Sequence, residues 1–528
     1  MSDSRLLSYH IFYFPFKWEK KGLERENFST RFDLDNIQPT NGCNWENLPH
    51  PCTDDYAAEL YNEKNFFYKF VHNVLYDTGD KANNIIRHYE RKEAYQTELT
   101  YEIKVTANCK EDIYRLRLKS IVLNLYSTGT GVLIFYLENN QYPEFSDILR
   151  INQFGRRIFP PFLNISNGIS GTKNAELADY IAITGLNGSA DRYFDDFIGY
   201  TTGSETWKAC RFIDSLIEDL SPEIKIEAVI DDRMHVVSWI GDNDLANKVK
   251  DESIFKDKND DWYRFLFIDG GGCTCQNEKM KKEIIEKHSY LRWQKEGSLY
   301  GVSRYSMVFL SGTSDFSCEV LFRNFRTMYA RMVELSLVQR ASILKFADEV
   351  THLSGLKETK TSELADRISD FYRAYIRFVN QIYFREITAQ EQGIEMYDMT
   401  QEEMKIADQV KDLDNEIGEL HDYAILLEGK EQNRKMAAIT VLGAIFLPAT
   451  FLVGLLGINT IPTNMPTYLF FPDSEPYKPF WISFALIVAL SALAIWFFNV
   501  KLKLEIREFF KSRINSKTYG KRKNTKRK

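Results

Sequence analysis

The chain has 528 residues, 44% of them hydrophobic and 14% aromatic, which is enough apolar side chain to fill the cores of two or three domains. This composition excludes a chain that stays mostly disordered. The formal net charge of −7 is unevenly spread, because residues 501–528 carry +10 and residues 1–500 carry −17.

Seven cysteines stand at scattered spacings, and no apolar leader opens the chain. We therefore expect the N-terminal part to lie in a reducing cytosol rather than to be held by disulfides. Cys273 and Cys275 are two residues apart, but no second pair of Cys or His stands at ligand spacing, so we expect no metal site there.

Residues 1–315 are expected to form a cytosolic α/β or α+β domain. Strand-like apolar runs predict strands at 8–14, 98–106, 113–126, 132–137, 223–230, 262–268 and 301–310. Residues 127–131 predict a hairpin turn, and helices are expected at 145–157 and 205–220. No dinucleotide fingerprint, phosphate-loop lysine motif or catalytic-triad spacing occurs, so we expect no enzyme.

Three short segments of this domain are candidates for contact with a nucleotide-like ligand. They supply Arg156 and Arg157, then Gly270, Gly271 and Gly272 after a predicted strand, then Arg304 and Tyr305. Arginine forks suit phosphate, and glycines let backbone N–H groups approach an anion. Solvated or salt-bridged arginines and a flexible glycine turn are the plainer interpretations.

Residues 316–435 are expected to form a helical stalk region, since no proline occurs between Pro222 and Pro448. Residues 400–403 resemble a capping box, which predicts one helix over 400–456 that is roughly 85 Å long at about 1.5 Å per residue. A heptad of apolar residues follows it, at Ile406, Val410, Leu413, Ile417, Leu420, Ala424 and Leu427. This seam predicts packing against residues 316–395, and a simple coiled coil is the alternative.

Two 21-residue stretches without a charge, 436–456 and 480–500, each match the length of a membrane-spanning helix. The connecting residues 457–479 carry three charges, whereas the basic tail 501–528 follows the second stretch. The positive-inside rule then places both termini in the cytosol at the inner (plasma) membrane. We favour this interpretation of the tail over nucleic-acid binding.

The first of these stretches carries a face of small, polar and flexible residues. Its members are Asn433, Met436, Thr440, Gly443, Leu447, Thr450, Gly454 and Gly457. Such a face predicts either close packing of membrane helices or, in several copies around an axis, a pore lined by uncharged oxygen dipoles. A pore of that kind suits a cation that keeps its hydration shell, such as Mg²⁺.

The motif around this stretch resembles the CorA metal-ion transporter family. It comprises Asn433-Arg434-x-Met436, Phe446-Leu447-Pro448-x-Thr450-Phe451-x-x-Gly454, and Gly457-Ile458-Asn459 before Met465-Pro466. The resemblance implies a pentameric funnel of five copies around one pore lined by the first span, with a Gly-Met-Asn motif at its outer mouth.

Each pore role is implied by the resemblance, position by position. Asn459 looks like the selectivity asparagine, and the pore-lining positions are Thr450, Leu447, Ile439, Met436 and Asn433, with Leu447 and Met436 as hydrophobic gates. The stripe itself selects Thr440 where the resemblance implies Ile439, so that level of the pore stays open.

The chain departs from the family pattern in three ways. Ile458 replaces the methionine of the Gly-Met-Asn motif, and residues 460–467 contain no acid to attract cations. The part before the first span is also far longer than in an ordinary CorA, which suggests an additional signal.

The opening segment 9–16, the hairpin 126–131 and the segment 300–306 look similar to the enlarged CorA-like effectors found with type III CRISPR systems. That likeness implies a channel gated by a nucleotide second messenger, plausibly the S-adenosylmethionine–AMP conjugate, with no direct nucleic-acid partner. The first alternative is a housekeeping Mg²⁺ transporter closed by Mg²⁺ at acids such as Asp231-Asp232 and Asp260-Asp261. The second is a membrane-tethered enzyme.

Overall fold

The computed structural model describes residues 5–457, except 24–25, 38, 41, 48–53, 78–84, 108–109, 162–176, 199, 201–208, 257 and 356–360, together with Ala485, Ala489 and Trp496. The chain divides into two compact units. Residues 1–359 and 366–424 form the first, and residues 360–365 and 425–528 form the second.

A large mixed β-sheet organises the first unit. Its main path runs in the order β11 (Ser289–Tyr290), β12 (Leu299–Ser303), β13 (Ser306–Ser311), β10 (His235–Gly241), β1 (Ser8–Lys20), β6 (Thr130–Asn139), β5 (Lys110–Tyr126), β4 (Leu99–Ala107), β7 (Tyr180–Thr184) and β8 (Phe194–Asp195). Off this path, β9 (Ile224–Ala228) pairs with β1, and β2 (Trp45–Glu46) pairs with β3 (Ile86–Arg91). Strands β10 and β13 pair in parallel, whereas β1 pairs antiparallel with both β10 and β6.

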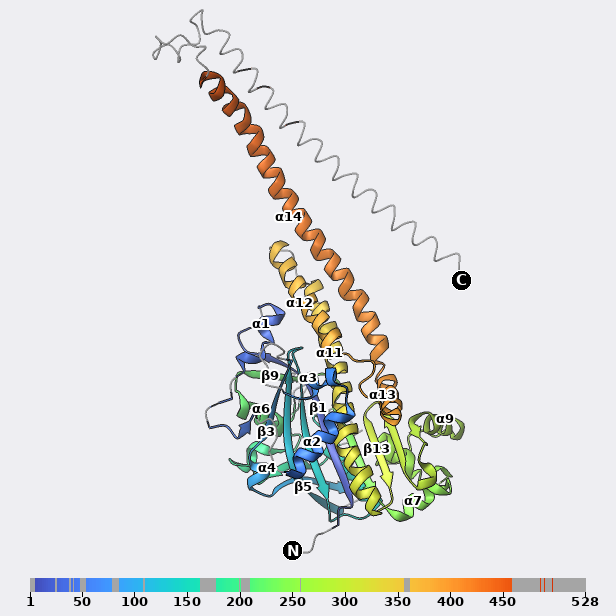
Figure 1. The fold of residues 1–528 in the computed structure, drawn as a ribbon. Helices are drawn as coiled ribbons and strands as arrows, with labels where there is room; N and C mark the ends of the chain where they lie inside the picture. Colours follow the sequence, from blue (N-terminus) through green and yellow to red (C-terminus); the bar gives the residue numbers. More distant parts are fainter. Residues whose placement is uncertain are drawn as a thin grey trace, which may run out of the picture. The chain divides into compact units, whose positions relative to one another are not determined.

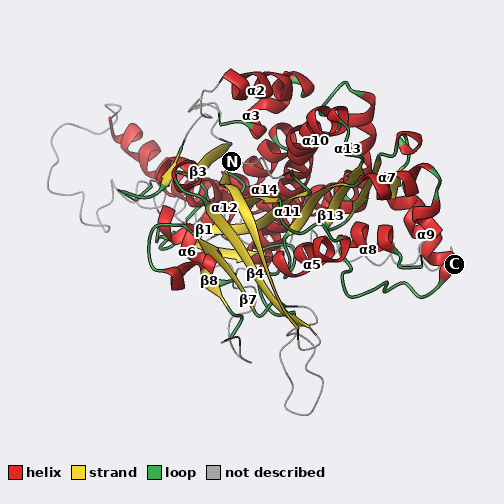
Figure 2. Cartoon of the chain, turned by 90° about the horizontal axis from the view of Figure 1, so that it is seen from below, coloured by secondary structure: helices red, strands yellow, loops and turns green. Residues whose placement is uncertain are grey.

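The structure describes fourteen α-helices, several of which cover the two faces of this sheet. They are α1 (Phe28–Arg31), α2 (Asp54–Phe66), α3 (His72–Leu75), α4 (Glu93–Gln96), α5 (Phe145–Gly155), α6 (Arg211–Leu220), α7 (Asn243–Lys250), α8 (Asp261–Phe267), α9 (Glu278–His288), α10 (Phe322–Asn324), α11 (Ala330–Gly355), α12 (Thr361–Gln381), α13 (Glu391–Met404) and α14 (Ile406–Gly457). Figure 2 shows α10, α11 and α13 on one side of the strands and α5, α6 and α8 on the other.

The alternation of side chains along β1 explains this three-layer arrangement. Tyr9 stacks edge-on against Phe322 of α10, and the hydroxyl of Tyr13 donates to the carbonyl of Ala330 at the start of α11. His10, between them in sequence, points to the opposite layer and bonds Asn152 of α5. Because successive strand residues point to opposite faces, β1 is buried on both sides and lies at the centre of the core.

A β-bulge between Leu118 and Ser120 interrupts the pairing of β5 with β6. Before the bulge, Tyr114 faces α5 and bonds Asp147. After it, Asn124 faces α11 and bonds Glu334. The extra residue, Lys119, therefore shifts the even-numbered side chains of β5 from one layer to the other.

The long helices begin with an unusual segment. Two π-helical turns, Ser317–Leu321 and Phe325–Tyr329, flank α10 and lead directly into α11. Helix α13 ends at Met404, and α14 begins at Ile406; between them Lys405 takes a left-handed conformation with φ +54°. Helix α14 has 52 residues, and it is drawn as one continuous helix in Figure 1.

The N-terminal α/β domain and the long helices confirm that part of the expected fold class, whereas the two membrane spans and the pentameric funnel stay predictions. The strands predicted at 8–14, 98–106, 113–126, 132–137 and 223–230 are present as β1, β4, β5, β6 and β9, and residues 127–131 form the hairpin turn between β5 and β6. The predicted helices 145–157 and 205–220 correspond to α5 and α6. Six seam residues of α14 within the first unit are buried: Ile406, Val410, Leu413, Ile417, Leu420 and Ala424.

Three predicted elements are wrong. Residues 262–268 were expected as a strand but belong to helix α8, in which Trp262, Phe265 and Leu266 share the buried face. The single strand predicted at 301–310 is a hairpin, β12 and β13, that turns at Arg304-Tyr305. The predicted capping box does not start a helix, since Thr400 lies inside α13 and donates to the carbonyl of Met396. Strand β10 was not predicted.

Candidate functional site

The positions implied as pore-lining lie on α14 as far as the structure describes them. Met436, Ile439 and Leu447 are 65%, 68% and 70% exposed, and Asn433 and Thr450 are exposed too. The hydroxyl of Thr450 donates to the carbonyl of Phe446 one turn earlier in the helix. Gly457 ends α14, whereas Ile458 and Asn459 lie outside the described residues. These roles remain predictions.

Within the part of the chain that the structure describes, no helix is both long enough and apolar enough to count as a membrane span. The predicted span 436–456 is the end of α14, several of whose side chains are not described, and the predicted span 480–500 is described only at Ala485, Ala489 and Trp496. The loop 457–479, beyond Gly457, and the tail 501–528 lie outside the described residues.

The three segments predicted to contact a ligand lie together at the end of α5. The carbonyl of Arg156 accepts from the backbone of Met234 at 2.7 Å, and Arg157 forms a β-bridge with Arg233. The turn between β12 and β13 joins them, since the carbonyl of Tyr305 accepts from the backbone of Val236. The glycine segment is adjacent, because Arg156 Nη2 donates to the carbonyl of Ile268 at 3.4 Å.

Five arginines gather around this meeting point, and we call them the arginine cluster: Arg156, Arg157, Arg233, Arg304 and Arg340. Asp231 and Asp232 supply its carboxylates. Arg157 Nη1 donates to Asp232, and Arg233 binds Asp231 through Nε at 2.9 Å. The guanidinium of Arg233 also lies over the ring of Tyr305, 4.7 Å from its centroid. One face of that ring is thus already covered.

Sequence reasoning missed three members of this site, Arg233, Arg340 and His235. Arg340 belongs to α11, and His235 opens β10. Neither stands in a motif; the one signal is the polar pair Gln339-Arg340 directly after the apolar pair Leu337-Val338. Both side chains are buried, with Arg340 only 5% exposed.

Burial makes charge costly at this site. Burial, followed by the neighbouring Arg157 and Arg233, lowers the pKa of Arg156. Burial and Arg304 likewise lower the pKa of Arg340. The pKa values of Arg156 and Arg340 are lowered because the surroundings do not fully compensate the positive charges of these two guanidinium groups.

Gly270, the first residue of the glycine segment, has a packing role. It follows helix α8 rather than a strand. A Cβ on Gly270 would stand 2.2 Å from Oε1 of Gln153, so a larger residue at this position would require the Gln153 side chain to move. Gly272 has φ +142°, and Gly271 has open space around it. The carbonyl of Gly270 already accepts from Arg264 at 2.8 Å.

Three of the four acids named for the alternative Mg²⁺ site are engaged in ion pairs. Asp231 and Asp232 bind arginines of the cluster, and Asp260 binds Lys281 at 2.8 Å. Among the described residues, no three His, Cys, Asp or Glu side chains are grouped so that they could hold a metal ion.

Comparison with known proteins gives a partial match. Residues 302–503, less than half of the chain, match the sequence model of the family described as "CorA-like Mg2+ transporter protein", so this part of the chain is similar to that family. A search of curated proteins finds no relative.

Two solved structures are similar at low identity. The complete CorA magnesium transporter from Methanocaldococcus jannaschii is 14% identical, with a TM-score of 0.20 over 51% of this chain and 92% of that one. The full-length CmaX protein is 15% identical, with a TM-score of 0.19 over 52% and 91%. These TM-scores are too low for either likeness to bear on the fold.

Proposed function

We propose that the chain is a subunit of a homopentameric CorA-type cation channel or transporter in the plasma membrane, controlled by its cytosolic domain. The observation that carries this proposal is the family match over residues 302–503, which includes all of α14. The family description makes a divalent cation such as Mg²⁺ the expected cargo.

The surface of α14 supports a membrane location for its second half. Met436, Ile439, Leu442, Phe446 and Leu447 are exposed on a single chain, and residues 436–456 contain no charge. Exposed apolar side chains on this scale need lipid or further copies of the chain to cover them. A polar stripe on the same helix escapes lipid when copies surround an axis.

The arginine cluster supports control by an anionic ligand. Arg156, Arg157 and Arg233 lie before the matched residues, in the part that makes this chain longer than an ordinary CorA, and the arginines of the cluster suit the phosphates of a nucleotide. We therefore propose a nucleotide second messenger, with the S-adenosylmethionine–AMP conjugate as the first candidate, and a role as a type III CRISPR antiviral effector. In this proposal Arg156, Arg157, Arg304 and Tyr305 contact the ligand.

A housekeeping Mg²⁺ transporter is the second candidate function, and the family description favours it. It would need an acidic site on the cytosolic domain, yet Asp231, Asp232 and Asp260 are held in ion pairs.

Reconstitution of the purified chain into vesicles loaded with a Mg²⁺-sensitive dye tests the proposal. We expect Mg²⁺ flux that changes when the conjugate is added on the cytosolic side, and native mass spectrometry should show five subunits. Flux that responds to Mg²⁺ but not to any adenylate would favour the transporter. A stable dimer without flux would overturn both candidates.

A further inference from the structure

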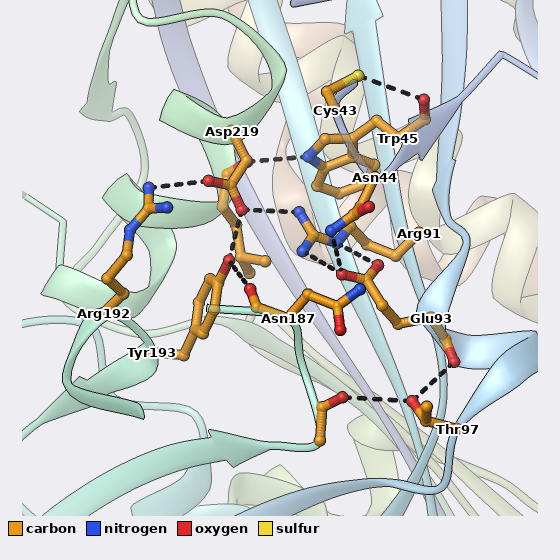
Figure 3. Close-up of polar contacts among 12 residues, drawn as sticks. Cys43, Asn44, Trp45, Arg91, Glu93, Thr97, Asn187, Arg192, Tyr193 and Asp219 are labelled. Atoms are coloured by element: carbon orange, nitrogen blue, oxygen red, sulfur yellow. Dashed lines mark hydrogen bonds and ion pairs between the residues drawn. The ribbon is translucent and has the colours of Figure 1, made fainter. Parts of the chain in front are cut away.

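Buried arginines elsewhere in this chain have their charge balanced within the protein. The fully buried guanidinium of Arg91 donates to Glu93 and to Asp219. The rings of Trp45 and Tyr193 lie against it, as Figure 3 shows. Such an arrangement satisfies both the charge and the planar set of N–H donors.

Arg31 and Arg331 follow the same pattern. Each pairs with two carboxylates, those of Glu19 and Glu349 for Arg31, and those of Glu63 and Glu334 for Arg331. Two carboxylates for each enclosed guanidinium is therefore the way this fold accommodates arginine.

The arginine cluster breaks this pattern. Its five guanidinium groups face two carboxylates, which leaves an excess charge of +3. Both carboxylates are already bound by Arg157 and Arg233. Within the described ranges, no carboxylate forms an ion pair with Arg156, Arg304 or Arg340.

The same three arginines hold unused hydrogen-bond donors. Nε and Nη1 of Arg156, Nε and Nη1 of Arg340, and Nε of Arg304 are shielded from solvent and have no partner. Arg156 is 3% exposed and Arg340 is 5% exposed. Native proteins satisfy nearly all such donors, and five of them gathered in a positively charged cluster fit the oxygens of an anion.

The three arginines come from separate elements that meet at His235. Arg156 ends α5, Arg304 belongs to the β12–β13 turn, and Arg340 lies in the middle of α11. Arg340 and Arg156 both act on the buried ring of His235, and Arg304 acts on Arg340. Three forks converging from different directions match a phosphate, which offers three oxygens and about two negative charges near neutral pH.

We propose that Arg156, Arg304 and Arg340 together bind one phosphate group of a phosphorylated ligand, and that Arg340 is the positioning residue through which binding reaches the stalk. The role of Arg340 in transmitting binding to the stalk rests on the proposed function. The phosphate site itself concerns the cytosolic domain alone.

The route from Arg340 to α14 runs through its neighbour Gln339. Gln339 donates to the hydroxyl of Tyr397 at 3.1 Å, and Gln401 donates to Oε1 of Gln339 at 2.6 Å. Both partners belong to α13, which ends one residue before Lys405 and the start of α14. A phosphate that draws Arg340 toward Arg156 therefore acts on α11. This helix is hydrogen-bonded through Gln339 to α13, and α13 leads into α14.

Entry of the phosphate requires movement of the β12–β13 turn. The free donors are out of reach of solvent, whereas Arg304 and Tyr305 in the turn are only half-buried. The turn must open to admit the ligand and close on it afterwards. A ligand shifts a conformational equilibrium only when it binds the two conformations unequally, and this site meets that condition.

Calorimetry on the full chain in detergent tests the phosphate site, with AMP and adenosine as probes at low ionic strength. We expect AMP to bind and adenosine not to bind. Arg340→Met should weaken AMP binding by roughly 10- to 100-fold, because it removes charged hydrogen bonds while keeping the volume of the side chain. Arg373→Ala, which removes an exposed arginine of α12 outside the cluster, should leave the affinity unchanged.

A second readout separates binding from a structural role for Arg340. Replacing an unpaired buried charge by an apolar side chain of similar size does not destabilise a fold that lacks its ligand. The melting temperature of ligand-free Arg340→Met should therefore equal or exceed that of the wild type, while the rise produced by AMP disappears. A lower melting temperature together with unchanged AMP affinity would overturn the proposal.

Hydrogen exchange tests the route to the stalk. AMP should slow exchange in residues 303–306 and in α13 of the wild type. In Gln339→Leu it should slow exchange only in residues 303–306.

Failure of this inference is distinguishable from failure of the proposed function. If AMP, inorganic phosphate and pyrophosphate all fail to bind, the phosphate site is wrong, even where vesicles carry Mg²⁺ flux. If AMP binds in the predicted way but vesicles carry no flux, the site stands and the channel does not. If AMP binds yet α13 exchanges as before, Arg340 has no part in transmission.

Discussion

His235 of β10 is buried next to Arg340 of α11, and burial together with this guanidinium lowers the pKa of the imidazole to about 3. Arg156 adds to the shift from the end of α5. A neutral histidine thus lies close to two cations. We expect this arrangement where the positive charge of a site binds a ligand rather than forming ion pairs within the protein.

The first prediction concerns acid stability. An unfolded histidine has a pKa of about 6.5, so between pH 6.5 and 3 the unfolded chain binds a proton at His235 that the folded chain does not. The free energy of unfolding should then fall by about 1.4 kcal/mol per pH unit as the pH drops below 6.5. His235→Gln should abolish this share of the loss. Urea unfolding at pH 7.5 and pH 5.0 measures it.

Between those two pH values the stability of the wild type relative to His235→Gln should decline by about 2 kcal/mol. His10, whose pKa burial lowers to about 4, contributes its own loss in both proteins and cancels in the comparison. Two parallel pH profiles would show that His235 is not enclosed as described.

The second prediction concerns the Arg91 network. Asp219 accepts hydrogen bonds from both Arg91 and Tyr193, at 2.8 and 2.6 Å. Asp219→Ala should cost about 3–5 kcal/mol of unfolding free energy, because it leaves the fully buried guanidinium of Arg91 with a single carboxylate. Chemical denaturation of the variant measures the cost.

An exposed ion pair provides the matched control. Arg117 and Glu138 lie 3.2 Å apart on neighbouring strands, and half of the Arg117 side chain is exposed. Arg117→Ala should cost no more than about 1 kcal/mol. Equal losses in the two variants would mean that burial does not determine the strength of the Arg91 network.

The third prediction concerns the break between α13 and α14. Lys405 has φ +54°, a left-handed conformation that costs an L-residue with a Cβ roughly 1–2 kcal/mol. Lys405→Gly should therefore raise the free energy of unfolding by about 1 kcal/mol, and Lys405→Ile should lower it. If the two substitutions act in the same direction, α13 and α14 are not separated at this residue.

The fourth prediction concerns the proposed pore mouth. Asn459→Ala and Asn459→Asp should change ion selectivity or abolish conduction while the five subunits remain assembled, since the proposed role of this amide is to face water at the mouth. Flux of Mg²⁺ and of monovalent cations into vesicles, with native mass spectrometry alongside, measures both properties. Unchanged flux in the two variants would remove Asn459 from the filter.

The fold could be predicted where one local pattern allows one structure. Strands β1, β4, β5 and β6 all contain β-branched and aromatic residues in apolar or alternating runs, and Ser127-Thr128-Gly129 supplies an explicit turn signal between the last two. Residues 262–268 were misassigned because a short apolar run looks the same in a strand and in a buried helix. The turn at Arg304-Tyr305 and the break at Lys405 contain neither glycine nor proline, so nothing in the sequence marks them.

The candidate site could be predicted only in pieces. Arg156 and Arg304 were recognised as separate segments, but their proximity depends on the pairing of β10 with β13 and on the β-bridge between Arg157 and Arg233. Arg340 lies almost two hundred residues from Arg156 along the chain and has no motif around it. Which arginines lack a carboxylate is a property of the folded chain.

Lys119 makes the length of β5 a constraint on how this sequence can vary. Successive side chains of β5 alternate between the two layers from Lys110 to Leu118 and again from Ser120 onward. Lys119 interrupts this alternation. A deletion of Lys119 would leave every later side chain of the strand chemically intact but turned to the wrong layer, with Asn124 no longer opposite Glu334. Loops of this domain can change length in related chains, whereas β5 must keep its residue count between Tyr114 and Asn124.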